Sequence, residues 1–167
     1  FKIIPLSEID NNIDVEEDKD TFEENAIKKA YEISKHLNGK MCISDDSGIE
    51  IEYLDGFPGV YTKRWHKGTD RDRNLEIINK LEGVKKENRK VKFVTAIALA
   101  EGENIITAVE NLEGYIAEEP RGENGFGFDE IFELENGKTL AEITEEEKNE
   151  ISARKKALEI LKSKLSY

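Results

Sequence analysis

Apolar residues recur every three or four positions in three stretches of the chain, which is the spacing of one helix face. Helix-starting residues precede these stretches, and Thr21 followed by Glu24 is the clearest capping-box pattern. The predicted helices cover about residues 22–37, 70–81 and 145–165. The residues expected to face inward from the second and third helices are Leu75, Ile78 and Leu81, and Ile151, Leu158, Leu161 and Leu165.

Elsewhere the pattern changes to short apolar runs and to alternation of period two, which is typical of strands. Two short strands are predicted at 41–44 and 49–54, the second with Ile49, Ile51 and Tyr53 on one face. Residues 91–100 and 104–112 predict an antiparallel hairpin, and 115–117 a further short strand. The turn formers of 55–59 predict a packed loop without a regular element. Because hairpins and helix-linked strands both occur, we expect one α/β domain with a mixed sheet.

Length, charge and cysteine content limit the number of domains, the binding partners and the cellular location that we expect. The 167 residues suit one domain, without an internal repeat or a linker. The excess of 37 Asp and Glu over 25 Lys and Arg, a formal charge of −12, disfavours nonspecific contact with nucleic acid or anionic membranes. No apolar stretch approaches the ~20 residues that span a bilayer. The lone Cys42 lies in an apolar run, so we expect it to be buried in a cytoplasmic protein.

Asp45 and Asp46 form the first candidate site, in the link between the two short predicted strands. Carboxylates at the end of a buried strand are suitable ligands for Mg²⁺, which takes one or two of them together with water and substrate phosphates. Glu16 and Glu17 precede the first helix and could reach the same ion. Asp, Ser and Gly are also turn formers, so a plain turn remains an alternative.

The glycine-rich stretch 121–129 forms the second candidate site. Phe126 and Phe128 alternate with glycines, which suits stacking of a base close to backbone, and Asp129 could accept hydrogen bonds from that base. Lys148 and Arg154 could reach the same groove. In isolation, a structural turn and a helix-dipole pattern explain these segments better than a binding site does, and neither a Walker A nor a Rossmann pattern is present.

Taken together, five segments resemble the inosine/xanthosine triphosphate pyrophosphatase family. They occur in the order of the family's motifs and span nearly the whole chain. The segments are Thr-Phe-Glu-Glu-Asn-Ala (21–26), Ser-Asp-Asp-Ser-Gly-Ile-Glu-Ile (44–51), Gly-Phe-Pro-Gly-Val-Tyr-Thr-Lys-Arg-Trp (56–65), Gly-Glu-Asn-Gly-Phe-Gly-Phe-Asp-Glu-Ile-Phe (122–132) and Glu-Glu-Lys-Asn-Glu-Ile-Ser-Ala-Arg (146–154).

The resemblance implies an elongated sheet flanked by helices, with two lobes around a nucleotide groove, in a homodimer. It also implies Mg²⁺-dependent hydrolysis of ITP, dITP and XTP to a nucleoside monophosphate and pyrophosphate. The implied roles are Asp46 as general base, Glu17, Asp45 and Asp46 as metal ligands, Lys29 and Ser47 at phosphate, Lys148 near the base and sugar, Phe126, Gly127, Phe128 and Asp129 around the base, and Arg154 at its 6-keto oxygen.

The chain departs from the family pattern at two places. The family begins with a strand and an Asn-x-x-Lys phosphate loop, whereas the segment that opens this chain at Phe1 resembles the part of the family sequence after that loop. We therefore expect residues 1–167 to lack the loop. Ala153 stands where the family has His. These departures leave open a nucleotide-binding paralogue without turnover. An interaction module and a pyrophosphatase for modified pyrimidine nucleotides are further alternatives.

Overall fold

The computed structural model describes residues 1–165, in which helices and strands alternate along the chain. The strands are β1 (Cys42–Ile51), β2 (Phe57–Pro58), β3 (Lys90–Glu101), β4 (Asn104–Ile116) and β5 (Phe132–Glu133). The α-helices are α1 (Phe22–His36), α2 (Asp70–Lys80), α3 (Glu145–Ile151) and α4 (Ala153–Lys164). Short 3-10 helices lie at η1 (Leu6–Glu8), η2 (Glu52–Leu54), η3 (Gly59–Tyr61), η4 (Lys86–Asn88) and η5 (Leu140–Glu142). Within residues 1–165, no helix combines the length and apolar character needed to cross a bilayer.

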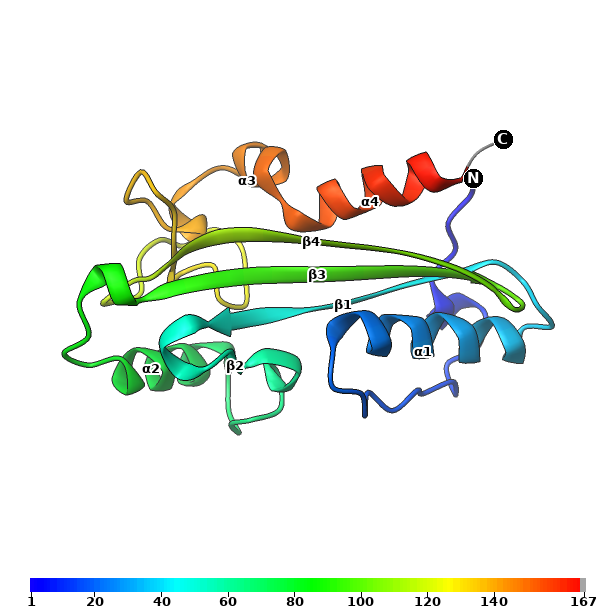
Figure 1. Cartoon of the computed structure of the whole chain (residues 1–167), viewed down its shortest axis with the longest axis horizontal. Helices are drawn as coiled ribbons and strands as arrows, with labels where there is room; N and C mark the ends of the chain where they lie inside the picture. Colours follow the sequence, from blue (N-terminus) through cyan, green and yellow to red (C-terminus); the bar gives the residue numbers. More distant parts are fainter. Residues whose placement is uncertain (166–167) are drawn as a thin grey trace.

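One five-stranded sheet in the order β2-β1-β3-β4-β5 runs the length of the molecule (Figure 1). The expected elongated α/β arrangement with flanking helices is confirmed. The expected mixture of strand directions is wrong, because all four strand pairings between these elements are antiparallel. The reason lies in the connection from β1 to β3: Ile51, the last residue of β1, pairs with Val91 near the start of β3, so the chain returns beside the point where it left.

β1 is one continuous strand, which corrects the prediction of two strands joined by a turn at Asp45 and Asp46. Every residue of β1 pairs with β3, including Asp46 opposite Ala96 and Gly48 opposite Val94. Ladder hydrogen bonds therefore override the turn preference of these residues. Gly48 serves close packing, because a Cβ there would lie 2.4 Å from Thr62 Oγ1 and 2.9 Å from the Gly59 carbonyl oxygen.

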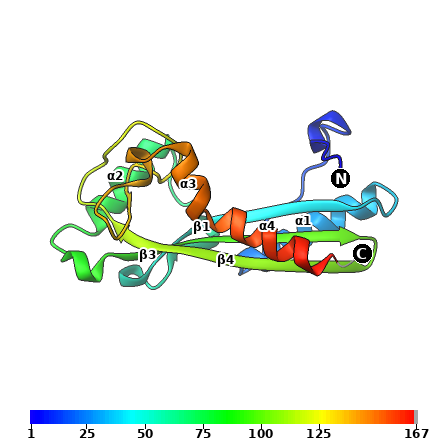
Figure 2. The same cartoon turned by 90° about the horizontal axis from the view of Figure 1, so that it is seen from above.

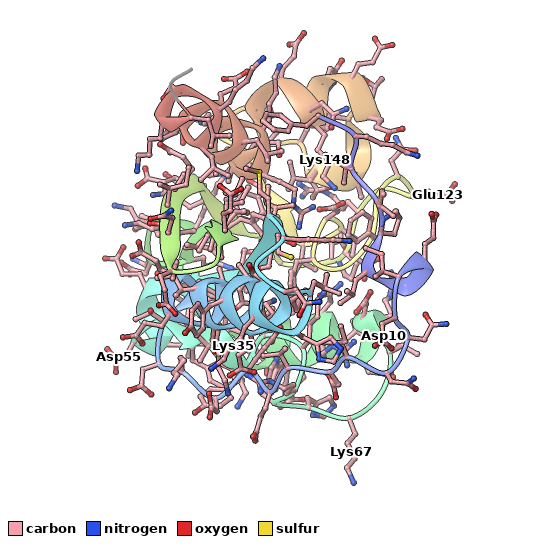
Figure 3. The ribbon with its side chains drawn as sticks, turned by 90° about the vertical axis from the view of Figure 1, so that its right-hand side faces the viewer. Asp10, Lys35, Asp55, Lys67, Glu123 and Lys148 are labelled. Carbon is pink, nitrogen blue, oxygen red and sulfur yellow. The ribbon has the colours of Figure 1, made fainter. Side chains whose placement is uncertain are left out.

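Helices cover both faces of the sheet at one end. α1 packs against small residues of β3, whereas α4 packs against larger ones on the opposite face (Figure 3, viewed along the sheet). The first cluster contains Phe22, Ala26, Ala30, Val94, Ala96, Ala98 and Ala100, and the second contains Ile97, Leu99, Ala108, Ala157 and Leu161. Charged side chains such as Lys67 and Glu123 extend away from the body of the molecule.

The other end of the sheet carries a second apolar core, with α2, α3 and the irregular segment between β4 and α3 gathered around it (Figure 2). The two separate ends correspond to the two lobes that the resemblance implies. The buried members of this core are Ile49, Ile51, Ile77, Leu81, Val91, Ile116, Ile131, Phe132, Leu140 and Ile143.

Predictions for the helices need two corrections. α2 begins with a capping box between Thr69 and Asp72, but Leu75 is 46% exposed. The buried positions of α2 are those of Asn74 and Ile77, so the helix is rotated relative to the apolar pattern. The predicted third helix is two helices, because Ser152 has an extended backbone and its hydroxyl accepts a hydrogen bond from Lys155 N. Leu158 in α4 is exposed rather than inward.

Smaller corrections concern the strands. The predicted strand at 115–117 is the end of β4. Residues 55–59 do contain a regular element, since Phe57 and Pro58 form β2. Tyr53 is 56% exposed in η2, so it does not share the buried face of Ile49 and Ile51. Cys42 is only partly buried, although burial still raises the pKa of its thiol.

A buried arginine joins α2 to the end of β4. Arg89 is 3% exposed, and its guanidinium donates to the carbonyl oxygens of Ile116 (2.8 Å), Leu81 (2.7 Å) and Ala117 (2.9 Å). These carbonyls lie at the end of α2 and at the end of β4, and that of Leu81 also accepts a hydrogen bond from Val84 N at 3.0 Å. Arg89 therefore supplies the donors that the second lobe needs at that point.

We expect Arg89→Met to lower the free energy of unfolding by about 3 to 5 kcal/mol, because it removes three charge-assisted hydrogen bonds from a buried position. Urea denaturation checks this expectation. Lys85→Met removes the same charge from an exposed neighbour and serves as the control. Equal stabilities for the two variants would show that Arg89 is not a structural anchor.

Candidate active site

Asp46 is the centre of the first group of polar residues. It lies on β1 opposite Ala96, on the face that α1 covers, and is 9% exposed. Its Oδ2 atom is buried without a hydrogen-bond partner. Burial raises the pKa of this carboxyl above its ordinary value; the negative charge of Glu17 adds to the rise and Lys29 opposes it. A carboxylate in this position lacks a positive or donor partner for one of its oxygens.

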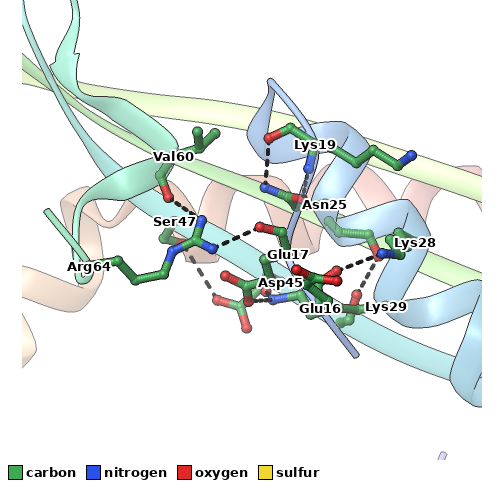
Figure 4. A network of polar contacts seen from close by, with 12 residues as sticks. Glu16, Glu17, Lys19, Asn25, Lys28, Lys29, Asp45, Ser47, Val60 and Arg64 are labelled. Carbon is green, nitrogen blue, oxygen red and sulfur yellow. Dashed lines mark hydrogen bonds and ion pairs between the residues drawn. The ribbon is translucent and has the colours of Figure 1, made fainter. Parts of the chain in front are cut away.

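The charge of Glu17 acts on Asp46, and several side chains hold the irregular segment 16–19 that carries Glu17 (Figure 4). Lys29 Nζ lies 2.8 Å from Glu17 Oε1 and 2.5 Å from the carbonyl oxygen of Asp45. Arg64 donates to the Glu17 carbonyl oxygen at 2.8 Å and to that of Val60 at 3.0 Å. Lys29 of α1 therefore holds the Glu17 carboxylate, and Arg64, just after η3, holds the Glu17 backbone.

Two further residues of α1 fix the same segment. Asn25 is fully buried, and its Oδ1 accepts a hydrogen bond from Lys19 N at 2.9 Å. Lys28 binds the Glu16 carbonyl oxygen and the Asp18 carboxylate, each at 2.8 Å. Glu16 itself is exposed, and its backbone rather than its carboxylate makes the contact with Lys28.

Asp45 points to the opposite face of the sheet from Asp46, because successive side chains of a strand alternate. Its carboxylate lies 2.7 Å from Arg154 Nη2, in an ion pair whose side chains are 43% and 49% exposed. Ser47 shares that face, where its hydroxyl lies 3.1 Å from Thr95 Oγ1 and 3.5 Å from Asp45 Oδ2. Asp45, Ser47 and Arg154 thus form a second group, separated from Asp46 by the sheet.

The glycine-rich segment forms a third group with α3. Lys148 Nζ lies 2.5 Å from Asp129 Oδ2 and 4.7 Å from the centroid of the Phe126 ring. Asp129 is 8% exposed and also accepts a hydrogen bond from Phe126 N at 3.0 Å. A cation, a carboxylate and an aromatic face therefore lie together, with Phe126 itself 75% exposed. Phe128 instead packs against the core of the second lobe.

The number and kind of oxygen atoms on Asp46 and Glu17 decide whether these two residues can bind Mg²⁺. Among residues 1–165, no group of three or more acidic, histidine or cysteine side chains is arranged to hold a metal on its own. Mg²⁺ usually needs only one or two protein carboxylates, with water and substrate phosphates completing its shell. Asp46 and Glu17 provide hard oxygen atoms whose two negative charges are opposed by the single charge of Lys29, and Asp46 Oδ2 has no hydrogen-bond partner. Asp46 and Glu17 therefore fit Mg²⁺ in the presence of a phosphate ligand.

Three residues outside the predicted set also build these groups: Asn25, Arg64 and Asn74. Asn25 follows Phe22 by three positions and Asn74 precedes Ile77 by three, so each occupies a position that helical spacing assigns to the core. A polar residue at an inward-facing helical position therefore indicates, from the sequence alone, a buried side chain that binds another segment. Arg64 has no comparable pattern around it. Ala153, at the departure from the family pattern, is buried at the start of α4.

Comparison with known proteins gives matches over nearly the whole chain. A family model described as the Ham1 family matches residues 1–164. The dITP/XTP pyrophosphatase of Bacillus subtilis (strain 168) is 46% identical over 165 residues, covering 96% of this chain and 83% of that protein. The corresponding protein of Thermoanaerobacter sp. (strain X514) is 44% identical over 165 residues, covering 97% of this chain and 83% of that protein.

Solved structures give the same result. The Ham1 protein of Staphylococcus aureus superposes with a TM-score of 0.92 at 36% identity, covering 98% of this chain and 86% of that one. A dITP/XTP pyrophosphatase from Mycobacterium abscessus superposes with a TM-score of 0.81 at 36% identity, covering 96% of this chain and 83% of that one. These matches confirm the resemblance inferred from the five sequence segments. The chain belongs to the Ham1 family.

Proposed function

We propose that this protein hydrolyses deaminated purine nucleoside triphosphates, namely ITP, dITP and XTP, to the nucleoside monophosphate and pyrophosphate. The observation that carries the proposal is the unpartnered buried oxygen of Asp46 beside Glu17 and Lys29, in a chain 46% identical to a dITP/XTP pyrophosphatase. Mg²⁺ dependence and a cytoplasmic location are parts of the same proposal.

In the proposed reaction, a water oxygen forms a bond to the α-phosphorus, and the bond from that phosphorus to the oxygen bridging to the β-phosphate breaks. Pyrophosphate leaves with the electron pair of that bond. Asp46 Oδ2, which has no partner of its own, takes the proton of the water. Lys29, already within reach of Glu17 and the Asp45 carbonyl, moves its positive charge to the phosphates. Ser47 was also expected at the phosphates, but its hydroxyl lies on the other face of the sheet with Thr95 and Asp45.

Glu17 and Asp46 are the carboxylates we propose to hold Mg²⁺. When bound, the ion would neutralise charge on the phosphate oxygens. Asp45 was expected to share this role, but its side chain lies on the other face of the sheet with Arg154. We therefore propose that Asp45 forms an ion pair with Arg154 and does not bind the metal.

For the base, we propose that Phe126 stacks on the purine, while Asp129, Lys148 and the backbone of Gly127 fix its edge. Arg154 would donate to the 6-keto oxygen, where adenine carries an amino donor instead. Leaving Asp45 costs Arg154 little, since exposed ion pairs are worth roughly 0.2 to 1 kcal/mol.

Pyrophosphate release from ITP, dITP, XTP, GTP and ATP tests the proposed function directly. With Mg²⁺ present, we expect kcat/KM for ITP, dITP and XTP to exceed that for ATP by about tenfold or more, because ATP leaves two donors facing each other. GTP keeps the 6-keto oxygen and shows whether the pocket reads the 2-position of the purine. No release from any of these nucleotides would overturn the proposal.

Asp46→Asn is the matched negative control for that measurement, with an expected loss of about 10² to 10⁴-fold in kcat. Glu50→Gln makes the same kind of change on the same face of β1, but at the position opposite Lys92. It should retain the activity of the unchanged chain. Equal losses in both variants would indicate a general effect on β1.

Thermal unfolding provides a second, activity-independent prediction. The folded state raises the pKa of Asp46, so its ionised form destabilises the fold at neutral pH, and Asp46→Asn should raise Tm in the absence of Mg²⁺. Adding Mg²⁺ with a nonhydrolysable triphosphate should raise Tm of the unchanged chain but not of the variant. An equal rise in both would place the ion elsewhere.

A homodimer also belongs to the proposal, on the basis of the family resemblance. Sedimentation equilibrium at micromolar concentration should give twice the mass of one chain. A single-chain mass over the whole concentration range would exclude it.

A further inference from the structure

Asn74 is a fully buried polar residue on α2, a helix that contributes nothing else to the three groups of site residues. It lies on the inward-facing side of α2 together with Ile77. Asn74 Oδ1 is buried without a hydrogen-bond partner. An apolar side chain would fill this position without such a cost, so packing alone gives no reason for an amide here.

The amide nitrogen of Asn74 faces the glycine-rich segment. Nδ2 donates to the carbonyl oxygen of Gly127 at 2.9 Å and to Glu130 Oε1 at 2.9 Å. The other oxygen of the Glu130 carboxylate accepts a hydrogen bond from Arg71 Nη1 at 2.7 Å. Arg71, Glu130 and Asn74 thus form a chain of contacts that runs from the surface of α2 to the Gly127 peptide.

Gly127 joins Phe126 to Phe128, and its φ is +61°, in the left-handed region. The carbonyl that Asn74 binds belongs to the peptide group between Gly127 and Phe128. Phe126 is 75% exposed, so packing does little to fix its ring. Its orientation depends instead on the contact with Lys148 Nζ, 4.7 Å from the ring centroid, and on the backbone around it. On one side Asp129 accepts from Phe126 N and binds Lys148 of α3; on the other side Asn74 binds the Gly127 carbonyl.

We propose that Asn74, oriented through Glu130 by Arg71, is a positioning residue for base recognition. It fixes the Gly127 peptide and, through it, the Phe126 ring and the backbone that faces the purine. The inference rests on the proposed function, and it assigns to α2 a role in binding the base but none in binding the phosphates. Asn74 acts through Gly127 and does not itself touch the nucleotide.

Asn74→Leu tests the proposal, with Asn79→Leu, the same change at an exposed position of α2, as the control. We expect Asn74→Leu to raise KM for ITP about tenfold and to change kcat by less than about threefold, because the lost contact affects binding of the base. Affinity for IMP should fall in parallel, whereas inhibition by inorganic pyrophosphate should be unchanged. A purely structural role would shift both ligands equally.

Arg71→Met removes the outer, exposed end of the same chain of contacts and spares the core. It should shift KM for ITP in the same direction by about two- to threefold, and it decides the question if Asn74→Leu does not fold. Unchanged IMP affinity in every folded variant, or equal losses of IMP and pyrophosphate affinity, would overturn the proposal. If the wild-type protein releases no pyrophosphate from ITP, the proposed function is overturned instead. The titrations with IMP and pyrophosphate would still test the positioning role of Asn74.

Discussion

Period-two alternation along β1 decides what each face of the sheet does. Because α1 covers one face and α4 the other, Asp45 and Asp46 cannot turn toward each other, although they are neighbours in the chain. Asp46 joins the acidic group held by α1, and Asp45 joins Arg154 on the other face. One strand thereby supplies two chemically different groups, and every other element of the site is arranged around that division.

Buried polar side chains hold the segments that lack regular structure. An irregular segment cannot pair its own backbone groups, so partners must come from elsewhere. Asn25 does this for residues 16–19, Asn74 for the glycine-rich segment, and Arg89 for the carbonyls where β4 ends. All three side chains are at most 3% exposed, so each is held by the packing of its lobe and in turn fixes the backbone that it binds.

Local sequence patterns predicted the elements well and their boundaries less well. The cap at Thr21 and the hairpin at Gly102 depend on a few neighbouring residues, and both were confirmed. The supposed turn at Asp45 was wrong because pairing with β3, a distant contact, overrides local turn preference. The prediction that Leu75 faces inward was wrong for a related reason. Asn74 takes the inward position on α2, and the hydrogen-bond partners of Asn74 lie more than fifty residues away in the sequence. The sequence was enough to identify the acidic residues as candidates. Placing Asp45 on the opposite face from Asp46 required the knowledge that both lie in one continuous strand.

The two lobes differ in how much change they can absorb. Ala26 and Ala30 of α1 share one fully buried cluster with Ala96 and Ala98 of β3, so a larger side chain at any of these positions would push away the helix that carries Lys29. Phe126 stands on a segment that is exposed and held mainly by hydrogen bonds. Substitutions are therefore easier to accommodate around the residues proposed to bind the base than around those proposed to bind the phosphates. A lineage built on this fold could change its nucleotide preference while the lobe proposed to carry out hydrolysis stays nearly constant.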